Sequence, residues 1–114
     1  MSLPHNDNRM NYNIKYQKRF ENITEVMKQD IETVIHKNVE GSKMSSFWKK
    51  HLKHPDAEAL IKIDLEKNDN ETYNGTIRLT IPGGPNLDYS RQEYKNIIDL
   101  VNNGFEKFTE SLAA

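Results

Sequence analysis

Two alternating runs of apolar and polar residues, separated by a polar turn, constrain the fold of this chain more than any other feature. Residues 57–67 read AEALIKIDLEK, and residues 73–82 read YNGTIRLTIP. Apolar residues recur at every second position in both runs, as in a β-strand with one buried face. Residues 68–72, NDNET, are rich in turn-forming residues. We therefore expect an antiparallel hairpin, with Asp64 and Glu66 on its solvent side.

Further elements flank this hairpin. The segment YNIKYQ at 12–17 also alternates and predicts a first strand. A helix is expected from Asn22 or Thr24, either of which can cap it, to Gly41, because apolar residues recur there every three or four positions. The segment LDYS at 87–90 predicts a short edge strand.

A final helix is expected to start near Ser90 or Arg91. Gly104 interrupts it, at a cost of about 1 kcal/mol relative to alanine. The element order β-α-β-β-β-α predicts an α+β fold, a two-layer sandwich in which a four-stranded sheet packs both helices on one face. The expected apolar stripe of the final helix consists of Tyr94, Ile97, Ile98, Val101, Phe105, Phe108 and Leu112.

The composition indicates one small domain. We expect residues 1–9 to be a disordered leader or tag remnant and residues 10–114 to form a single domain. The chain has no cysteine, which excludes disulfides and thiolate metal sites. It has no apolar run of the roughly 18 residues that span a membrane and no secretory signal pattern, so a cytoplasmic location is expected.

The net charge of −1 conceals a division between a basic half and an acidic half. Residues 15–54 carry nine Lys or Arg against five Asp or Glu, whereas residues 55–114 carry six against eleven. The segment FWKKHLKHPD at 47–56 lies where the two halves meet. Its composition leaves three readings open: a metal site, a nucleic-acid contact or a solvated connector. An anionic partner for the first half is the expectation that the asymmetry favours.

Metal binding is the weakest of these readings. His51 and His54 lie near Asp56, but a closed site needs about four ligands, and the neighbouring lysines repel cations. The PGGPN segment at 82–86 lacks the ending of a phosphate loop, and no nucleophile elbow or HExxH motif is present. We therefore expect no metal, no cofactor and no enzymatic activity.

The lysine clusters are the best functional candidates. Lys49, Lys50 and Lys53 follow Trp48, and Lys18 and Arg19 precede the first helix. Such clusters neutralise phosphates without reading sequence, although solvated surface lysines explain them about as well. Trp48 could anchor the connector to a helix or stack on a base or partner. Phe105 and Phe108 are expected to be core residues.

Three segments in order resemble the family of ribosome hibernation-promoting factors and ribosome-associated inhibitors. They are FENITEVMKQDIE at 20–32, IKIDLEKNDNETYNGTIRLTIPGG at 61–84 and EYKNIIDLVNNGFEKF at 93–108. The resemblance covers roughly residues 10–112 and implies a short family member without the C-terminal extension of the long forms. The positions that match the family's pattern are Glu66 and Lys67 in the hairpin and Tyr94, Ile98, Asp99 and Lys107 in the last segment.

This resemblance implies a stress-response protein that regulates translation. It would enter the decoding region of the small ribosomal subunit and block mRNA and tRNA sterically, with cationic side chains along rRNA phosphates. The chain departs from the family pattern at Gly104, Phe108 and Lys95, which leaves the last helix poor in positive charge. Two alternatives follow. The cationic contact with rRNA has moved partly into the 42–56 connector, or the fold persists and ribosome binding has been lost.

The expected partner is accordingly the rRNA of the small subunit, with no membrane and no small-molecule substrate, and the free protein is expected to be a monomer. The alternative is a protein-interaction module on the same fold that has lost RNA binding. Salt separates the two, because phosphate contacts weaken steeply as salt rises. The expected RNA-binding residues are Lys18, Arg19, Lys28, Lys49, Lys50, Lys53, Arg78, Arg91 and Lys107.

Overall fold

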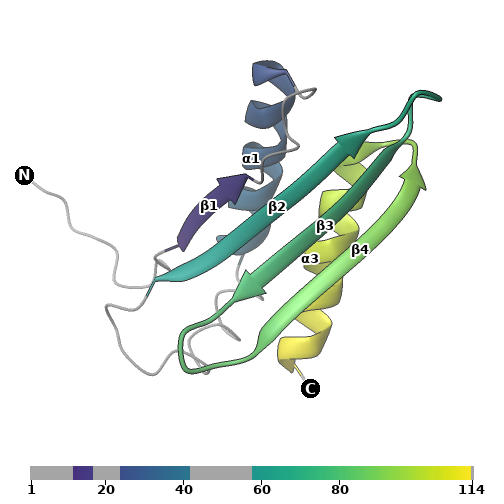
Figure 1. Ribbon diagram of the computed structural model, residues 1–114. Coiled ribbons are helices and arrows are strands. Elements are labelled where there is room, and N and C mark those ends of the chain that lie inside the picture. The colour runs from purple at the N-terminus through teal and green to yellow at the C-terminus, as the bar shows by residue number, and fades with distance from the viewer. Residues whose placement is uncertain (1–11, 17–23, 42–57, 114) are drawn as a thin grey trace, which may run out of the picture.

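A computed structural model describes residues 12–16, 24–41 and 58–113 (Figure 1). The order β-α-β-β-β-α and the α+β class agree with the prediction. None of the described helices is long and apolar enough to cross a membrane. The elements are β1 (Tyr12–Tyr16), α1 (Glu25–Val39), β2 (Ala59–Lys67), β3 (Tyr73–Thr80), β4 (Asn86–Tyr94) and α3 (Ile97–Ala113).

The four strands form one sheet in the order β1-β2-β3-β4. β2 and β3 pair antiparallel, with Ile63 opposite Ile77, so the predicted hairpin is confirmed. β1 instead runs parallel to β2, with Ile14 opposite Ile61. A parallel pair needs a long crossover connection, and α1 lies within it. The register of β1 therefore depends on how α1 packs and not on a local turn.

The two described helices, α1 and α3, lie on the same side of the sheet, behind it in the view of Figure 1. The side chains between the two layers are almost entirely apolar, and their burial removes the alternating face of each strand from water. In the described part of the chain, the opposite face of the sheet is covered by no helix. The core includes Ile31, Ile35 and Val39 from α1, Ile61, Ile63, Leu65, Ile77 and Leu79 from the strands, and Leu100, Val101, Phe105 and Phe108 from α3.

The two helices begin with side-chain caps, one of them as predicted. The Thr24 hydroxyl accepts a hydrogen bond from the backbone N–H of Met27 at 3.2 Å, which confirms Thr24 as the cap of α1. In α3 the Asn96 side-chain oxygen accepts from the N–H groups of Ile98 and Asp99, at 3.0 and 3.2 Å. The last helix therefore begins at Ile97.

The predicted start of this helix near Ser90 or Arg91 is wrong. Those residues belong to β4, which is longer than the predicted four-residue edge strand and ends at Tyr94. The pairing of β4 with β3 outweighs the helix propensity of this segment, because Ser90 lies opposite Thr76 and Tyr94 opposite Tyr73. The pairing is irregular between Tyr73 and Gly75, beside Glu93, whose φ is 53°.

Tyr94 consequently contributes to the sheet and not to the helical stripe. Its hydroxyl accepts a hydrogen bond from the Asn103 side chain at 2.8 Å, which links β4 to α3. Gly104 also has a positive role that the sequence did not indicate. A Cβ atom there would lie 3.1 Å from Cδ2 of Tyr89 and 3.2 Å from Cδ1 of Ile77. The missing side chain therefore lets α3 approach the sheet closely.

Candidate nucleic-acid interface

The face of the sheet opposite the helices is polar, and we call it the open face. Strand alternation turns one set of side chains to the core and the other to this face. Asp64 and Glu66 lie on it, as predicted for the solvent side of the hairpin. The open face carries Asn13 and Lys15 from β1, Leu60, Lys62, Asp64 and Glu66 from β2, Asn74, Thr76, Arg78 and Thr80 from β3, and Asn86, Asp88 and Ser90 from β4.

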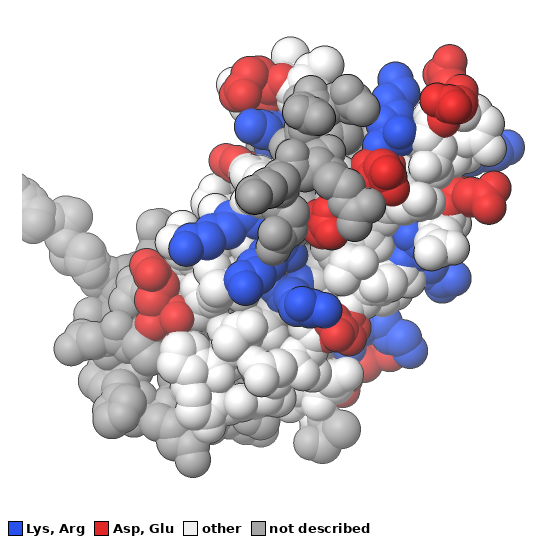
Figure 2. Space-filling model, in the orientation of Figure 1, with Lys and Arg blue, Asp and Glu red and all other residues white. Residues whose placement is uncertain are grey.

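Three cationic residues lie side by side across the open face, and we call them the cation row. Lys15 is the register partner of Lys62, and Lys62 is the partner of Arg78. Neighbouring strands are about 4.8 Å apart, so the backbone positions of the row span roughly 10 Å. Figure 2 shows Lys and Arg atoms gathered near the middle of this face. The row concentrates positive charge at one level of the sheet.

The row ends at an acidic residue on β4. Asp88 is the register partner of Arg78, and its Oδ2 lies 3.8 Å from the Arg78 Nε. The two side chains are 65% and 58% exposed, so the pair is well solvated. Exposed ion pairs of this kind contribute about 0–1 kcal/mol. Arg78 can therefore exchange Asp88 for an anionic ligand at little cost.

A shallow polar groove of about 220 Å³ lies beside the cation row. Asp64, Thr76 and Ser90 line it, and the hydroxyls of Thr76 and Ser90 are 2.8 Å apart. Asn74 fixes one end, because its side-chain oxygen accepts from the N–H of Glu93 at 2.9 Å. The groove thus offers hydroxyl, amide and carboxylate groups, and Arg91 also lines it.

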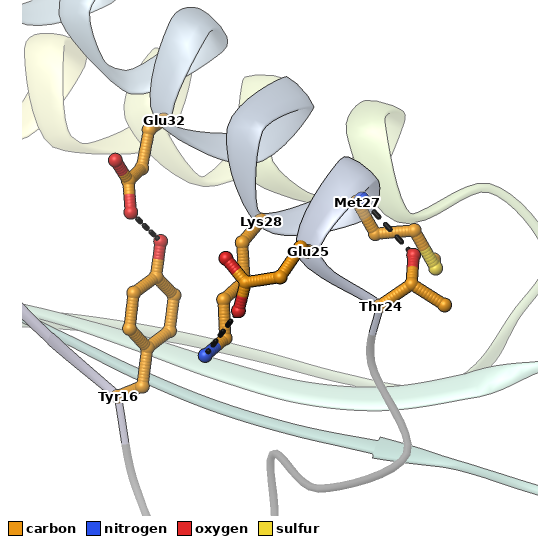
Figure 3. Close-up of polar contacts among 6 residues, drawn as sticks. All are labelled: Tyr16, Thr24, Glu25, Met27, Lys28 and Glu32. Carbon is orange, nitrogen blue, oxygen red and sulfur yellow. Dashed lines mark hydrogen bonds and ion pairs between the residues drawn. The ribbon is translucent and has the colours of Figure 1, made fainter.

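Lys28, one of the predicted RNA-binding residues, lies on the helix side (Figure 3). Its Nζ is 3.5 Å from the Glu25 carboxylate and 5.3 Å from the centre of the Tyr16 ring. The Tyr16 hydroxyl donates to Glu32 at 2.5 Å. Burial, followed by this hydrogen bond and the charge of Glu32, raises the pKa of Tyr16 well above its ordinary value. These contacts fasten β1 to α1 and occupy Lys28 locally.

Arg91 and Lys107 also lie away from the cation row. The Arg91 Nε donates to the Tyr89 hydroxyl at 2.9 Å, and the guanidinium lies 5.6 Å from the centre of that ring. This hydrogen bond raises the pKa of Arg91. Lys107 is exposed on α3. The two helices with their flanking residues, 24–41 and 97–113, carry seven acidic residues against three lysines. The helix layer is therefore net acidic.

The structure separates the predicted residues that it describes. Arg78 lies on the open face, Lys28 and Lys107 on the helices, and Arg91 on the edge strand. The other five predicted residues, at 18, 19, 49, 50 and 53, lie outside the described residues, as do Trp48 and the histidines of the connector. Within the described segments, no group of three or more His, Asp or Glu could hold a metal ion.

Sequence reasoning missed Lys15 and Lys62 as parts of a site. Alternation already placed both side chains on the solvent side of their strands. Their adjacency required the register between β1 and β2, which no local turn determines. Lysines at outward positions of successive strands were the available signal.

Comparisons with known proteins add a likeness of fold. No family model and no curated protein matches the sequence. Among solved structures, the chain is similar to the N-terminal domain of Protein Y from Thermus thermophilus, with a TM-score of 0.52 and 13% sequence identity. The alignment covers 90% of this chain and 96% of that domain. The chain therefore shares its fold with this domain over nearly the whole length of both.

Proposed function

We propose that this protein associates with the ribosome, binds rRNA at the decoding region of the small subunit and blocks translation by occupying that region. The observation that carries the proposal is the cation row, Lys15, Lys62 and Arg78, on a sheet face that no described helix covers. Two further findings support it. Three sequence segments resemble the hibernation-factor family and follow one another in the same order as in that family. The fold is similar to the Protein Y N-terminal domain.

The proposed mechanism is electrostatic and steric, without a chemical step. Lysine and arginine side chains neutralise phosphates, and the counterions they release favour binding. Such contacts position a protein on RNA without reading its sequence. Translation stops because the protein occupies space that mRNA and tRNA need.

In this proposal, the charges of the sheet and of the helix layer determine which face of the protein lies toward the rRNA. The acidic helix layer repels phosphates, whereas the cation row attracts them. The open face then lies toward the rRNA and the helices lie away from it. This arrangement accommodates the low positive charge of the last helix, where the sequence departs from the family pattern.

Co-sedimentation with small ribosomal subunits tests the proposal. We expect the protein to pellet at low salt and to be released as salt rises. A Lys62→Gln/Arg78→Gln variant should pellet less, whereas Lys37→Gln/Lys95→Gln removes the same charge away from the cation row and should pellet like the wild type. Failure of the wild type to pellet at low salt would contradict ribosome association. A Lys49→Glu/Lys50→Glu/Lys53→Glu variant tests the connector separately.

A protein-interaction module is the second candidate. It is favoured by the acids of the open face, since Asp64, Glu66 and Asp88 equal the cation row in number. Complementary charges across a protein interface would use both signs. Binding to rRNA stripped of ribosomal proteins distinguishes the two, because a protein-directed module should lose its partner there while an rRNA-binding protein should not.

A further inference from the structure

The open face has no aromatic side chain among its described residues. Each described tyrosine and phenylalanine ring lies in the core or packs against it, and His36 lies on α1, in the helix layer. Proteins that hold single-stranded RNA commonly stack its bases on exposed aromatic rings. The described surface therefore offers no stacking platform beside the cation row. The rings concerned are Tyr12, Tyr16, Tyr73, Tyr89, Tyr94, Phe105 and Phe108.

The groups that the open face does offer match a different form of RNA. The A-form duplex has a wide, shallow minor groove that displays 2′-hydroxyls between two lines of phosphates. The cation row supplies partners for phosphates, and the neighbouring groove supplies Thr76 and Ser90, whose hydroxyls can donate or accept. Building on the proposed function, we propose that the open face binds the sugar–phosphate surface of duplex RNA, with the 2′-hydroxyls over the polar groove.

The arrangement of charge defines how the duplex lies on the sheet. Along β2, Lys62 is followed on the same face by Asp64 and Glu66, so phosphates placed along the strand would meet carboxylates. Across the strands, phosphates meet Lys15, Lys62 and Arg78 in succession. The phosphate line therefore crosses the strands along the cation row. The carboxylate of Asp64 lies on the groove side, where a 2′-hydroxyl can donate to it.

Binding of short RNAs to the full chain, measured by fluorescence anisotropy, tests this inference. The probes are an RNA duplex of about 16 base pairs, one of its strands alone, and a DNA duplex of the same sequence. We expect the RNA duplex to bind at least about tenfold more tightly than either other probe, because the single strand lacks the paired geometry and the DNA lacks the 2′-hydroxyls. Equal or tighter binding of the single strand, or equal binding of the DNA duplex, would overturn the inference.

Matched variants then locate the contact. Lys62→Gln/Arg78→Gln should weaken duplex RNA binding by about tenfold or more and reduce its salt dependence. Lys37→Gln/Lys95→Gln, which removes two exposed charges away from the cation row, should leave both unchanged. Asp88→Asn, which removes the acid 3.8 Å from Arg78, should tighten binding by roughly two- to fivefold. Equal losses in the two double variants would place the contact elsewhere and overturn the inference, provided circular dichroism shows both folded.

The outcome of the RNA-binding experiment can be distinguished from the outcome of co-sedimentation, which tests the proposed function. Pelleting with small subunits but no preference for duplex RNA overturns this inference and leaves ribosome association standing. A protein that binds duplex RNA but does not pellet supports the inference and contradicts ribosome association. A protein that neither pellets with small subunits nor prefers duplex RNA overturns both proposals.

Discussion

The two faces of the sheet are built from alternate residues of the same strands but have opposite properties. On β2, Ile63 is fully buried under the helices, whereas its neighbours Lys62 and Asp64 lie on the open face. The covered face holds the apolar core, and the open face holds the cation row and the polar groove. Stability and proposed binding therefore depend on different residues of one backbone, and substitutions should affect them separately.

The largest effect is expected on the covered face, at Phe105. Its ring is fully buried and packs edge-on against Phe108, with 5.4 Å between ring centres. Phe105→Ala should lower the free energy of unfolding by about 3–5 kcal/mol, because it leaves a cavity in the core. Urea denaturation measures this loss. Lys62→Gln on the open face should change stability by less than about 0.5 kcal/mol, and a comparable loss there would contradict the separation of the faces.

The next effect compares adjacent residues of β3 that point to opposite faces. A Cβ atom at Gly75 would lie 2.7 Å from Cδ2 of Leu65 and 3.1 Å from Cδ1 of Leu100. Gly75→Ala should therefore cost about 1–3 kcal/mol by overpacking. Thr76→Val, on the open face, keeps the β-branched shape but removes the hydroxyl that bonds to Ser90, and should cost less, about 0.5–1 kcal/mol. Thermal unfolding of the two variants measures the difference, and equal values would show that the core accommodates the extra methyl group.

The parts of the fold that the sequence predicted are those with local signals. Alternation defines β2 and β3, and Thr24 stands directly before the apolar periodicity of α1. The boundary between β4 and α3 was missed because residues 91–94 favour a helix by propensity, while their pairing with β3 is tertiary. A local signal did exist, since Asn96 immediately precedes the apolar residues of α3.

The candidate site was less accessible to sequence reasoning than the fold. Arg78 was identified for its charge, and Lys62 was recognised as outward-facing in a strand. Their juxtaposition with Lys15 depends on a parallel register that the α1 crossover establishes. Clustering along the sequence instead drew attention to lysines of the connector. Contiguity in sequence is a poor guide to a charge pattern that runs across strands.

An intermediate effect is expected at the start of α3. Asn96→Ala removes the oxygen that accepts from the N–H groups of Ile98 and Asp99. The free energy of unfolding should fall by about 1 kcal/mol, as for other helix caps. Asn96→Asp retains an accepting oxygen and should preserve most of the stability in urea denaturation. Equal losses in both variants would show that Asn96 acts through its amide nitrogen and not as a cap.

The smallest effect concerns the hydroxyl that fastens β1 to α1, and it depends on pH. Tyr16 donates to Glu32 at 2.5 Å, and burial together with this bond raises its pKa well above 10. Unfolded tyrosine ionises near pH 10, while the folded chain keeps the proton, so this contribution is complete below pH 10 and is lost as pH rises above it. Tyr16→Phe should cost up to about 1 kcal/mol at pH 7. Above pH 10 the stability of Tyr16→Phe should fall less steeply than that of the wild type, and the difference in unfolding free energy between the two should narrow.

Urea denaturation from pH 7 to 11 follows this gap in unfolding free energy, with Thr76→Val as a control whose stability should stay parallel to that of the wild type. A constant gap between Tyr16→Phe and the wild type above pH 10 would mean that the hydroxyl ionises alike in both states, and would contradict the raised pKa of Tyr16.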